Sequence, residues 1–153
     1  MSDPKQLSDA RGEWFELYVA SAGEGFNLRG CELGSRSHVI DADMMVESGD
    51  YITMARSAAP GFVPDYVYSG LTLSNSQGTL SLVCRGTLID EVSYDRARGF
   101  QLGAGASLSL DPVYLDAHDN DRAGSWCQGM SEFNGDRGTP GRENSPCPPK
   151  QAG

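Results

Sequence analysis

The sequence predicts an all-β protein, built as an antiparallel β-sandwich with at most one short helix. Three observations lead to this expectation. Apolar residues alternate with a period of two rather than 3.6 along most of the chain. About seven such runs follow one another at short, regular spacing, with turn residues between them. Glycine (19) and proline (8) exceed the usual share of about 12% of residues, which favours turns over a helical bundle.

The first two expected strands cover residues 13–19 and 26–33. In the first, Phe15 and Leu17 share one face because side chains of a strand alternate between its two sides. In the second, the apolar residues change face at Gly30, which suggests a β-bulge there.

The next two expected strands cover residues 50–56 and 67–74. Ile52 and Met54 lie on one face of the earlier strand. The later strand ends at a turn signal, Asn-Ser-Gln-Gly, at residues 75–78.

A hairpin is expected from residues 79–84 and 88–94, joined by a tight turn at Arg85 and Gly86. The apolar face of the first strand carries Leu80, Leu82 and Cys84. Strict alternation places Leu88, Asp90, Val92 and Tyr94 together on one face of the second strand.

The last expected strand covers residues 106–111 and stops at Pro112. Residues 112–122 form the single helical candidate, with Asp111 as its N-cap. From Ser131 onward, glycine, proline, asparagine and serine predict coil.

The length and charge of the chain narrow the possible functions. A chain of 153 residues suits one compact domain, which we expect at 9–147 between flexible termini at 1–8 and 148–153. The net charge of −9 disfavours nucleic acid as a partner. No apolar run reaches the ~20 residues that a membrane span needs.

The four cysteines are widely spaced and include no Cys-x-x-Cys pair, so two disulfides fit them better than zinc. Cys31 and Cys84 both lie on inward faces, which predicts one pair, and Cys127 with Cys147 is the other. Disulfides indicate an oxidising compartment: secreted, periplasmic or cell surface. The first residues are polar and lack a signal peptide, so we interpret the chain as a mature segment or an excised domain. A cytosolic protein with reduced thiols is the alternative.

Several segments, in one order, resemble the lamin tail domain family, including its bacterial members. They are GEWFELYVAS at 12–21, LRGCEL at 28–33, YSGLTLSNSQGTLSLV at 68–83, LIDEVSYD at 88–95, SLSLD at 107–111, Trp126-Cys127 and GDRGTPGREN at 135–144. The chain departs from that family at Val19, usually asparagine, and at Cys31, more often tryptophan.

The resemblance implies an immunoglobulin-like sandwich that serves as a structural or interaction module. In nuclear lamins the domain binds proteins and chromatin, and similar bacterial domains occur in secreted or surface proteins, often beside hydrolase domains. The domain is not known for catalysis. A fold does not determine a function, so this step is an analogy.

The motifs favour a non-catalytic module that binds protein, polysaccharide or neighbouring domains of a longer chain. No nucleophile elbow, zinc-protease, P-loop or dinucleotide motif is present, and no cofactor is expected. The alternatives are a small hydrolase using acidic residues, with a metal in the 116–121 loop, or an accessory domain of a larger hydrolase. Binding to chromatin or DNA, by analogy with lamins, is opposed by the charge.

The 116–121 loop is the one calcium candidate, through Asp116, Asp119 and Asp121. An EF-hand counted from Asp119 fails, because Ala123 and Met130 occupy ligand positions. We therefore expect these aspartates to close turns, with at most weak calcium binding.

Seven further residues are candidates for structural or binding roles. Asp90 is expected to face inward and accept hydrogen bonds from the backbone or an arginine. Trp14 and Tyr18 share the outer face of the first strand and could form a partner patch. In GDRGTPG we expect a tight closing turn built by Asp136, Gly138, Pro140 and Gly141, with left-handed backbone at both glycines.

Overall fold

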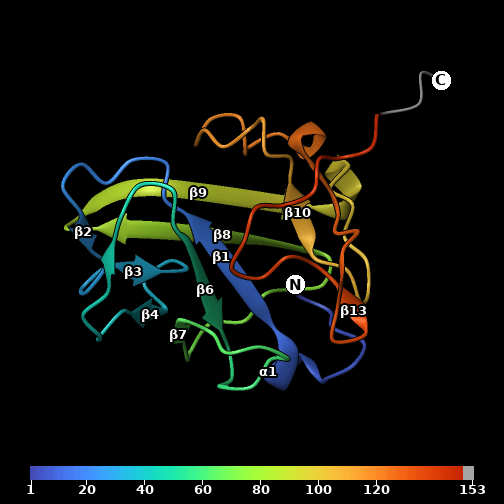
Figure 1. The fold of residues 1–153 in the computed structure, drawn as a ribbon, viewed down its shortest axis with the longest axis horizontal. Helices are drawn as coiled ribbons and strands as arrows, with labels where there is room; N and C mark the ends of the chain where they lie inside the picture. Colours follow the sequence, from blue (N-terminus) through green and yellow to red (C-terminus); the bar gives the residue numbers. More distant parts are fainter. Residues whose placement is uncertain (150–153) are drawn as a thin grey trace.

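The computed structural model describes residues 1–149, and it confirms the all-β class (Figure 1). One short α-helix occurs in these residues, α1 (Asp9–Gly12), with two 3₁₀ helices at Arg96–Arg98 and Ala123–Ser125. Neither α1 nor any other helix within 1–149 has the length and apolar character required to cross a membrane.

The prediction of a helix at 112–122 is wrong, because these residues form successive turns. The Asp111 carboxylate accepts the Val113 N–H at 3.1 Å, and the Asp116 carboxylate accepts the His118 N–H at 2.8 Å. Such local side-chain bonds offer the backbone an alternative to helical hydrogen bonding.

Two sheets hold most of the longer strands. The three-stranded sheet has the order β1-β6-β7, and the four-stranded sheet has the order β4-β3-β8-β9. The strands of the first are β1 (Trp14–Tyr18), β6 (Tyr51–Ala55) and β7 (Tyr66–Val67). Those of the second are β3 (Glu32–Leu33), β4 (His38–Val39), β8 (Gln77–Cys84) and β9 (Thr87–Asp95). β6 and β7 run parallel, an exception to the antiparallel expectation.

Three two-stranded ladders complete the fold at its two ends (Figure 1). They are β2 (Phe26–Asn27) with β5 (Met45–Val46), β10 (Leu108–Leu110) with β11 (Trp126–Gln128), and β12 (Glu132–Phe133) with β13 (Asp136–Arg137). The last pair lies in the region expected to be coil.

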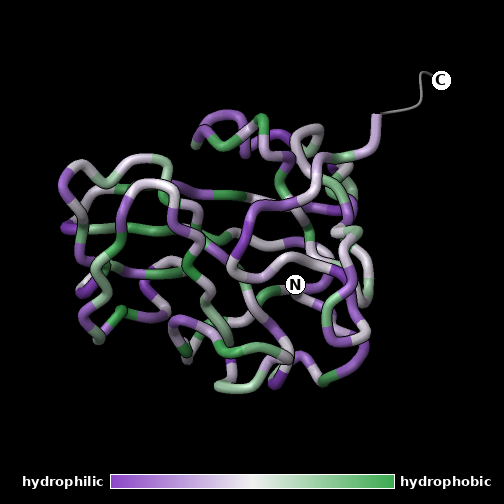
Figure 2. The backbone as a smooth tube through the Cα atoms, in the orientation of Figure 1, coloured by the Kyte–Doolittle hydropathy of each residue, from purple (hydrophilic) through white to green (hydrophobic). Residues whose placement is uncertain are grey.

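One hydrophobic core draws side chains from both sheets. It includes Phe15 of β1, Met54 of β6, Leu33 of β3 and Cys84 of β8. Figure 2 shows hydrophobic residues interspersed with hydrophilic ones along the strands, as expected for sheets with one buried face. The sandwich arrangement and its immunoglobulin-like form stay predictions.

The hairpin of β8 and β9 forms around the expected turn. Arg85 (φ 52°) and Gly86 (φ 77°) both have left-handed backbone, as a two-residue turn between twisted strands requires. The register of this pair shifts between Leu82, which is opposite Asp90, and Val83, which is opposite Leu88. Leu88 and Asp90 therefore lie on opposite faces of β9, and their expected placement on one face is wrong. The expected bulge at Gly30 is instead a turn, in which the Cys31 N–H bonds to the Leu28 carbonyl at 3.0 Å.

Both predicted disulfides, Cys31–Cys84 and Cys127–Cys147, are confirmed. The first lies in the main core, and the second ties β11 to the C-terminal coil.

The N-terminal segment 1–8 is packed, so its expected flexibility is wrong. Met1 is buried, and its backbone exchanges two hydrogen bonds with Trp14, at 3.0 and 3.1 Å. The Asp3 carbonyl accepts the Gly105 N–H at 2.7 Å. At the other end, residues 148 and 149 are coil, and the rest of the expected flexible segment lies outside the described residues.

Candidate functional site

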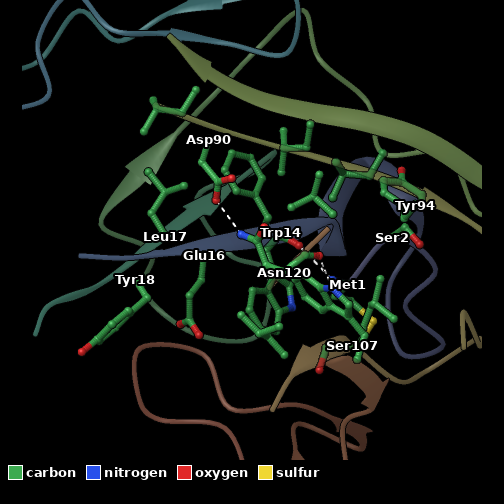
Figure 3. Close-up of a pocket in the computed structure, with 18 of the residues that line it drawn as sticks. Met1, Ser2, Trp14, Glu16, Leu17, Tyr18, Asp90, Tyr94, Ser107 and Asn120 are labelled. Carbon is green, nitrogen blue, oxygen red and sulfur yellow. Dashed lines mark hydrogen bonds between the residues drawn. The ribbon is translucent and has the colours of Figure 1, made fainter. Parts of the chain in front are cut away.

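A partly open cavity of about 280 Å³ lies between β1 and β9 (Figure 3). We name it the β1–β9 cavity. Its walls include six partly exposed aliphatic side chains: Leu17, Leu80, Leu82, Val92, Leu108 and Leu110. The volume exceeds the ~150 Å³ of an apolar cavity that admits benzene and approaches the ~300 Å³ of ordinary ligand sites. A second hollow, of about 580 Å³, lies around the Cys127–Cys147 disulfide and has a more polar lining.

The two sheet edges at this cavity have no neighbouring strand within the described residues. β1 ends the three-stranded sheet, and β9 ends the four-stranded sheet. The cavity lining includes Glu16, Leu17 and Tyr18 of β1 and Asp90 of β9. In Figure 3, Leu17 and Asp90 lie on one side of β1, and Glu16 and Tyr18 lie on the other. The cavity is therefore the place where the core between the two sheets reaches the surface.

The structure separates the two aromatic residues of the expected partner patch. Trp14 is only 4% exposed, because its ring packs edge-on against Phe62 (5.4 Å between centroids) and Phe133 (5.8 Å). Tyr18 is partly exposed and packs against Tyr51 at 4.9 Å. Trp14 therefore belongs to a core cluster rather than to a surface patch, and this half of the expectation is wrong.

Glu16 is a carboxylate at the cavity that the sequence analysis missed. Its Oε2 accepts the Gly141 N–H at 2.7 Å. Burial raises the pKa of Glu16 to about 7, and the Gly141 N–H partly opposes this rise. The outward position of Glu16 follows from the alternation of β1, but its contact with Gly141, 125 residues away, could not be foreseen.

Asp90 faces the cavity, in agreement with its expected inward orientation (Figure 3). One oxygen accepts the Glu91 N–H at 2.8 Å, and the other accepts the Asn120 amide N–H at 2.6 Å. Burial raises the pKa of Asp90, and the negative charges of Asp121 and Asp116 add to this rise. The Glu91 N–H is the backbone donor that was expected as one alternative, and the second donor is Asn120 rather than an arginine.

Two of the three aspartates of the calcium candidate, Asp116 and Asp119, have local partners. The Asp116 carboxylate bonds to the backbone of His118, and Asp119 forms an ion pair with Arg122 at 3.4 Å. Within residues 1–149, no group of three or more His, Cys, Asp or Glu side chains is arranged to hold a metal ion. Weak calcium binding at this loop stays a prediction that a titration can test.

Asp136 anchors the N-terminal segment rather than a local turn. Its buried carboxylate accepts the backbone N–H groups of Lys5, at 3.2 Å, and of Gln6, at 3.4 Å. The expected acceptor role is therefore present, although its donors lie 131 and 130 residues away in the sequence.

Gly138 and Gly141, on either side of Pro140, have different structural roles. Pro140 is partly buried. Gly141 has left-handed backbone (φ 79°), as expected, whereas Gly138 does not. A Cβ on Gly138 would lie 3.1 Å from side-chain atoms of Ser107 and Trp14. Gly138 is therefore required by close packing, and the expected left-handed conformation is wrong.

Comparisons of this chain with protein-family models, with curated proteins and with solved structures give no match. The likeness to the lamin tail domain family therefore stays an expectation based on the quoted segments. A fold alone does not define an activity, so the β1–β9 cavity and its surroundings are the features that bear on function.

Proposed function

We propose that this protein is a non-catalytic interaction module of a secreted or cell-surface protein, and that it binds a protein partner at the β1–β9 cavity. One observation carries the proposal: the core opens to solvent between two strand edges, through a wall of partly exposed aliphatic side chains. Covering such a surface is favourable, at about 25 cal/mol per Å² of apolar area removed from water.

Other features support this assignment. The two disulfides fit an oxidising compartment, and the resemblance to lamin tail domains favours an interaction module. An aliphatic lining suits apolar side chains of a protein better than the hydroxyl groups of a polysaccharide. The two carboxylates do not form the facing pair that a hydrolase would use, because Asp90 of β9 and Glu16 of β1 lie on different sides of β1 in Figure 3. Each also accepts a hydrogen bond from another part of the chain.

A neutral apolar dye, N-phenylnaphthylamine, tests whether the cavity is a binding site. We expect saturable binding to the native protein and at least a tenfold loss of affinity in Leu110→Trp, which fills the cavity. Val63→Trp is the matched control, because Val63 is 92% exposed and lies outside the cavity lining. Circular dichroism verifies the fold of each variant, and Leu108→Phe is the substitute if Leu110→Trp does not fold. Absence of dye binding, or equal binding by the filled variant, would contradict the proposal.

A further inference from the structure

We infer that the partner presents an extended strand, with alternating apolar and basic residues, that pairs antiparallel with the free edge of β1 at Glu16 and Tyr18. The inference rests on the proposed function and specifies the partner. It follows from the backbone of β1, the position of Met1, the shape of the cavity and the local charge.

The backbone of β1 uses only its odd-numbered residues to pair with β6. The Glu13 carbonyl accepts the Arg56 N–H at 3.0 Å, and the Val19 N–H donates to the Asp50 carbonyl at 2.9 Å. In an antiparallel strand, residues alternate between hydrogen bonding to one neighbour and facing the other side. The even-numbered residues of β1 therefore present their N–H and C=O groups away from β6.

Met1 already pairs with this outward edge. It exchanges both backbone hydrogen bonds with Trp14, which defines an antiparallel, hydrogen-bonded residue pair. The next outward positions along β1 are Glu16 and Tyr18, and their backbone groups have no backbone partner in residues 1–149. An incoming strand would extend the pairing that Met1 begins, and backbone hydrogen bonds would supply part of its affinity.

The two sides of such a strand would meet different surroundings. On the side of Phe15 and Leu17, its side chains would enter the β1–β9 cavity, so apolar residues fit there. On the opposite side, its side chains would lie beside the Glu16 carboxyl, which is charged above its pKa of about 7, so lysine or arginine fits there in that pH range. The net charge of −9 also favours approach of a basic segment.

The free edge of β9 is a poorer site for strand addition. The register between β9 and its neighbour β8 shifts between Leu82 and Val83 of β8. The Glu91 N–H of β9 already donates to the Asp90 carboxylate at 2.8 Å. Bulges and inward-pointing charges are features that protect sheet edges from pairing. Strand addition is therefore assigned to β1.

The probe is an acetylated, amidated seven-residue peptide of alternating valine and lysine, titrated by calorimetry at a pH above 7, where the Glu16 carboxyl is charged. We expect it to bind at least tenfold more tightly than the same peptide with glutamate in place of lysine. N-methylation of the amides on one edge of the peptide should cost at least tenfold in affinity, and N-methylation on the other edge should cost little. Hydrogen exchange should slow at least tenfold at the Glu16 and Tyr18 amides, while the Phe15 and Leu17 amides, which face β6, stay unchanged.

The outcomes separate this inference from the proposed function. Peptide binding without protection of the Glu16 and Tyr18 amides, or with equal affinity for both N-methylated peptides, would overturn strand addition. Equal binding of the lysine and glutamate peptides would overturn the basic character of the partner. Dye binding without peptide binding would overturn the inference and leave the proposed function standing, whereas loss of both would overturn both.

Discussion

Two glutamates of the first strand region, Glu13 and Glu16, are shielded from solvent in different ways. The Glu13 carboxylate is almost fully buried, accepts the Tyr68 hydroxyl at 2.7 Å and lies 3.8 Å from Arg56. Glu16 instead has the Gly141 N–H as its one short hydrogen bond within the described residues. Burial raises the pKa of both carboxyls, so each adds a cost to folding when it is charged.

We predict that the parent protein loses stability as pH rises, and that Glu16→Gln does not show this loss. The pKa of Glu16 is about 7 in the folded protein against 4.5 as reference, because burial outweighs the Gly141 N–H, the Met1 amino group and Arg142, while Asp65 adds to the rise. The folded state therefore binds the proton more strongly between these values. Its free energy of unfolding falls as pH increases from about 4.5 to 7, by up to roughly 3 kcal/mol.

Urea unfolding of both proteins from pH 4 to pH 8 measures this effect. The variant should match the parent protein near pH 4 and exceed its stability above pH 7. A stability difference that does not change with pH would show that the Glu16 carboxyl is not shifted.

At the scale of elements, alternation predicted the strands that have one buried face. β1, β6 and the body of β9 match the expected ranges, because period-two patterning reports directly on a half-buried strand. β8 begins at Gln77, two residues before its expected start, so it takes up part of the segment expected to be a turn. The two-residue strands β12 and β13 were missed because so short a ladder carries no alternation. The burial of Trp14 was missed because it depends on Phe62 and Phe133, whose positions are set by tertiary packing.

The candidate site was predictable only in part for the same reason. Alternation predicted that Asp90 faces inward, since both β8 and β9 were recognised as strands. The contacts of Glu16 with Gly141 and of Asp136 with Lys5 each join residues more than 120 positions apart. Pairings of that kind leave no local signal in a single sequence.

Asp136→Ala should detach the N-terminal segment from β13. The substitution removes the acceptor of the Lys5 and Gln6 N–H groups, and we expect the free energy of unfolding to fall by about 1–3 kcal/mol. Hydrogen exchange at these two amides should accelerate. Asp136→Asn, which keeps one acceptor oxygen, is the control and should lose less. Unchanged exchange at both amides in Asp136→Ala would contradict the anchoring role.

Gly138→Val tests the packing between the C-terminal loop and β1. The new side chain would meet Ser107, Trp14 and Phe133, the last at 3.3 Å, so we expect a loss of about 1–3 kcal/mol from overpacking. The matched control is Gly86→Asn, at the hairpin turn, where nothing lies within 4 Å of an added Cβ and asparagine tolerates left-handed backbone. Denaturant unfolding measures both variants, and an equally stable Gly138→Val would show that this contact can relax freely.

At the scale of the whole molecule, the two disulfides stabilise different regions. Cys31–Cys84 lies within the core shared by the two sheets. Cys127–Cys147 closes the coil that carries Asn144, and the Asn144 amide donates to the Leu110 carbonyl at 3.0 Å. Because both Asn144 and Leu110 line the β1–β9 cavity, the second disulfide holds one of its walls.

Removing each disulfide should therefore affect stability and binding differently. The sequence separations of 53 and 20 residues correspond to roughly 4 and 3 kcal/mol of stability in the chain-entropy treatment of cross-links. We expect Cys31→Ala with Cys84→Ala to lower the free energy of unfolding more, yet to keep the dye affinity at temperatures where the protein is folded. Cys127→Ala with Cys147→Ala should cost less stability but weaken dye binding at least fivefold, since the wall at Leu110 is released. Denaturant unfolding and dye titration of both double variants provide the measurements. Equal dye affinity in the two would mean that the cavity keeps its shape without the second disulfide.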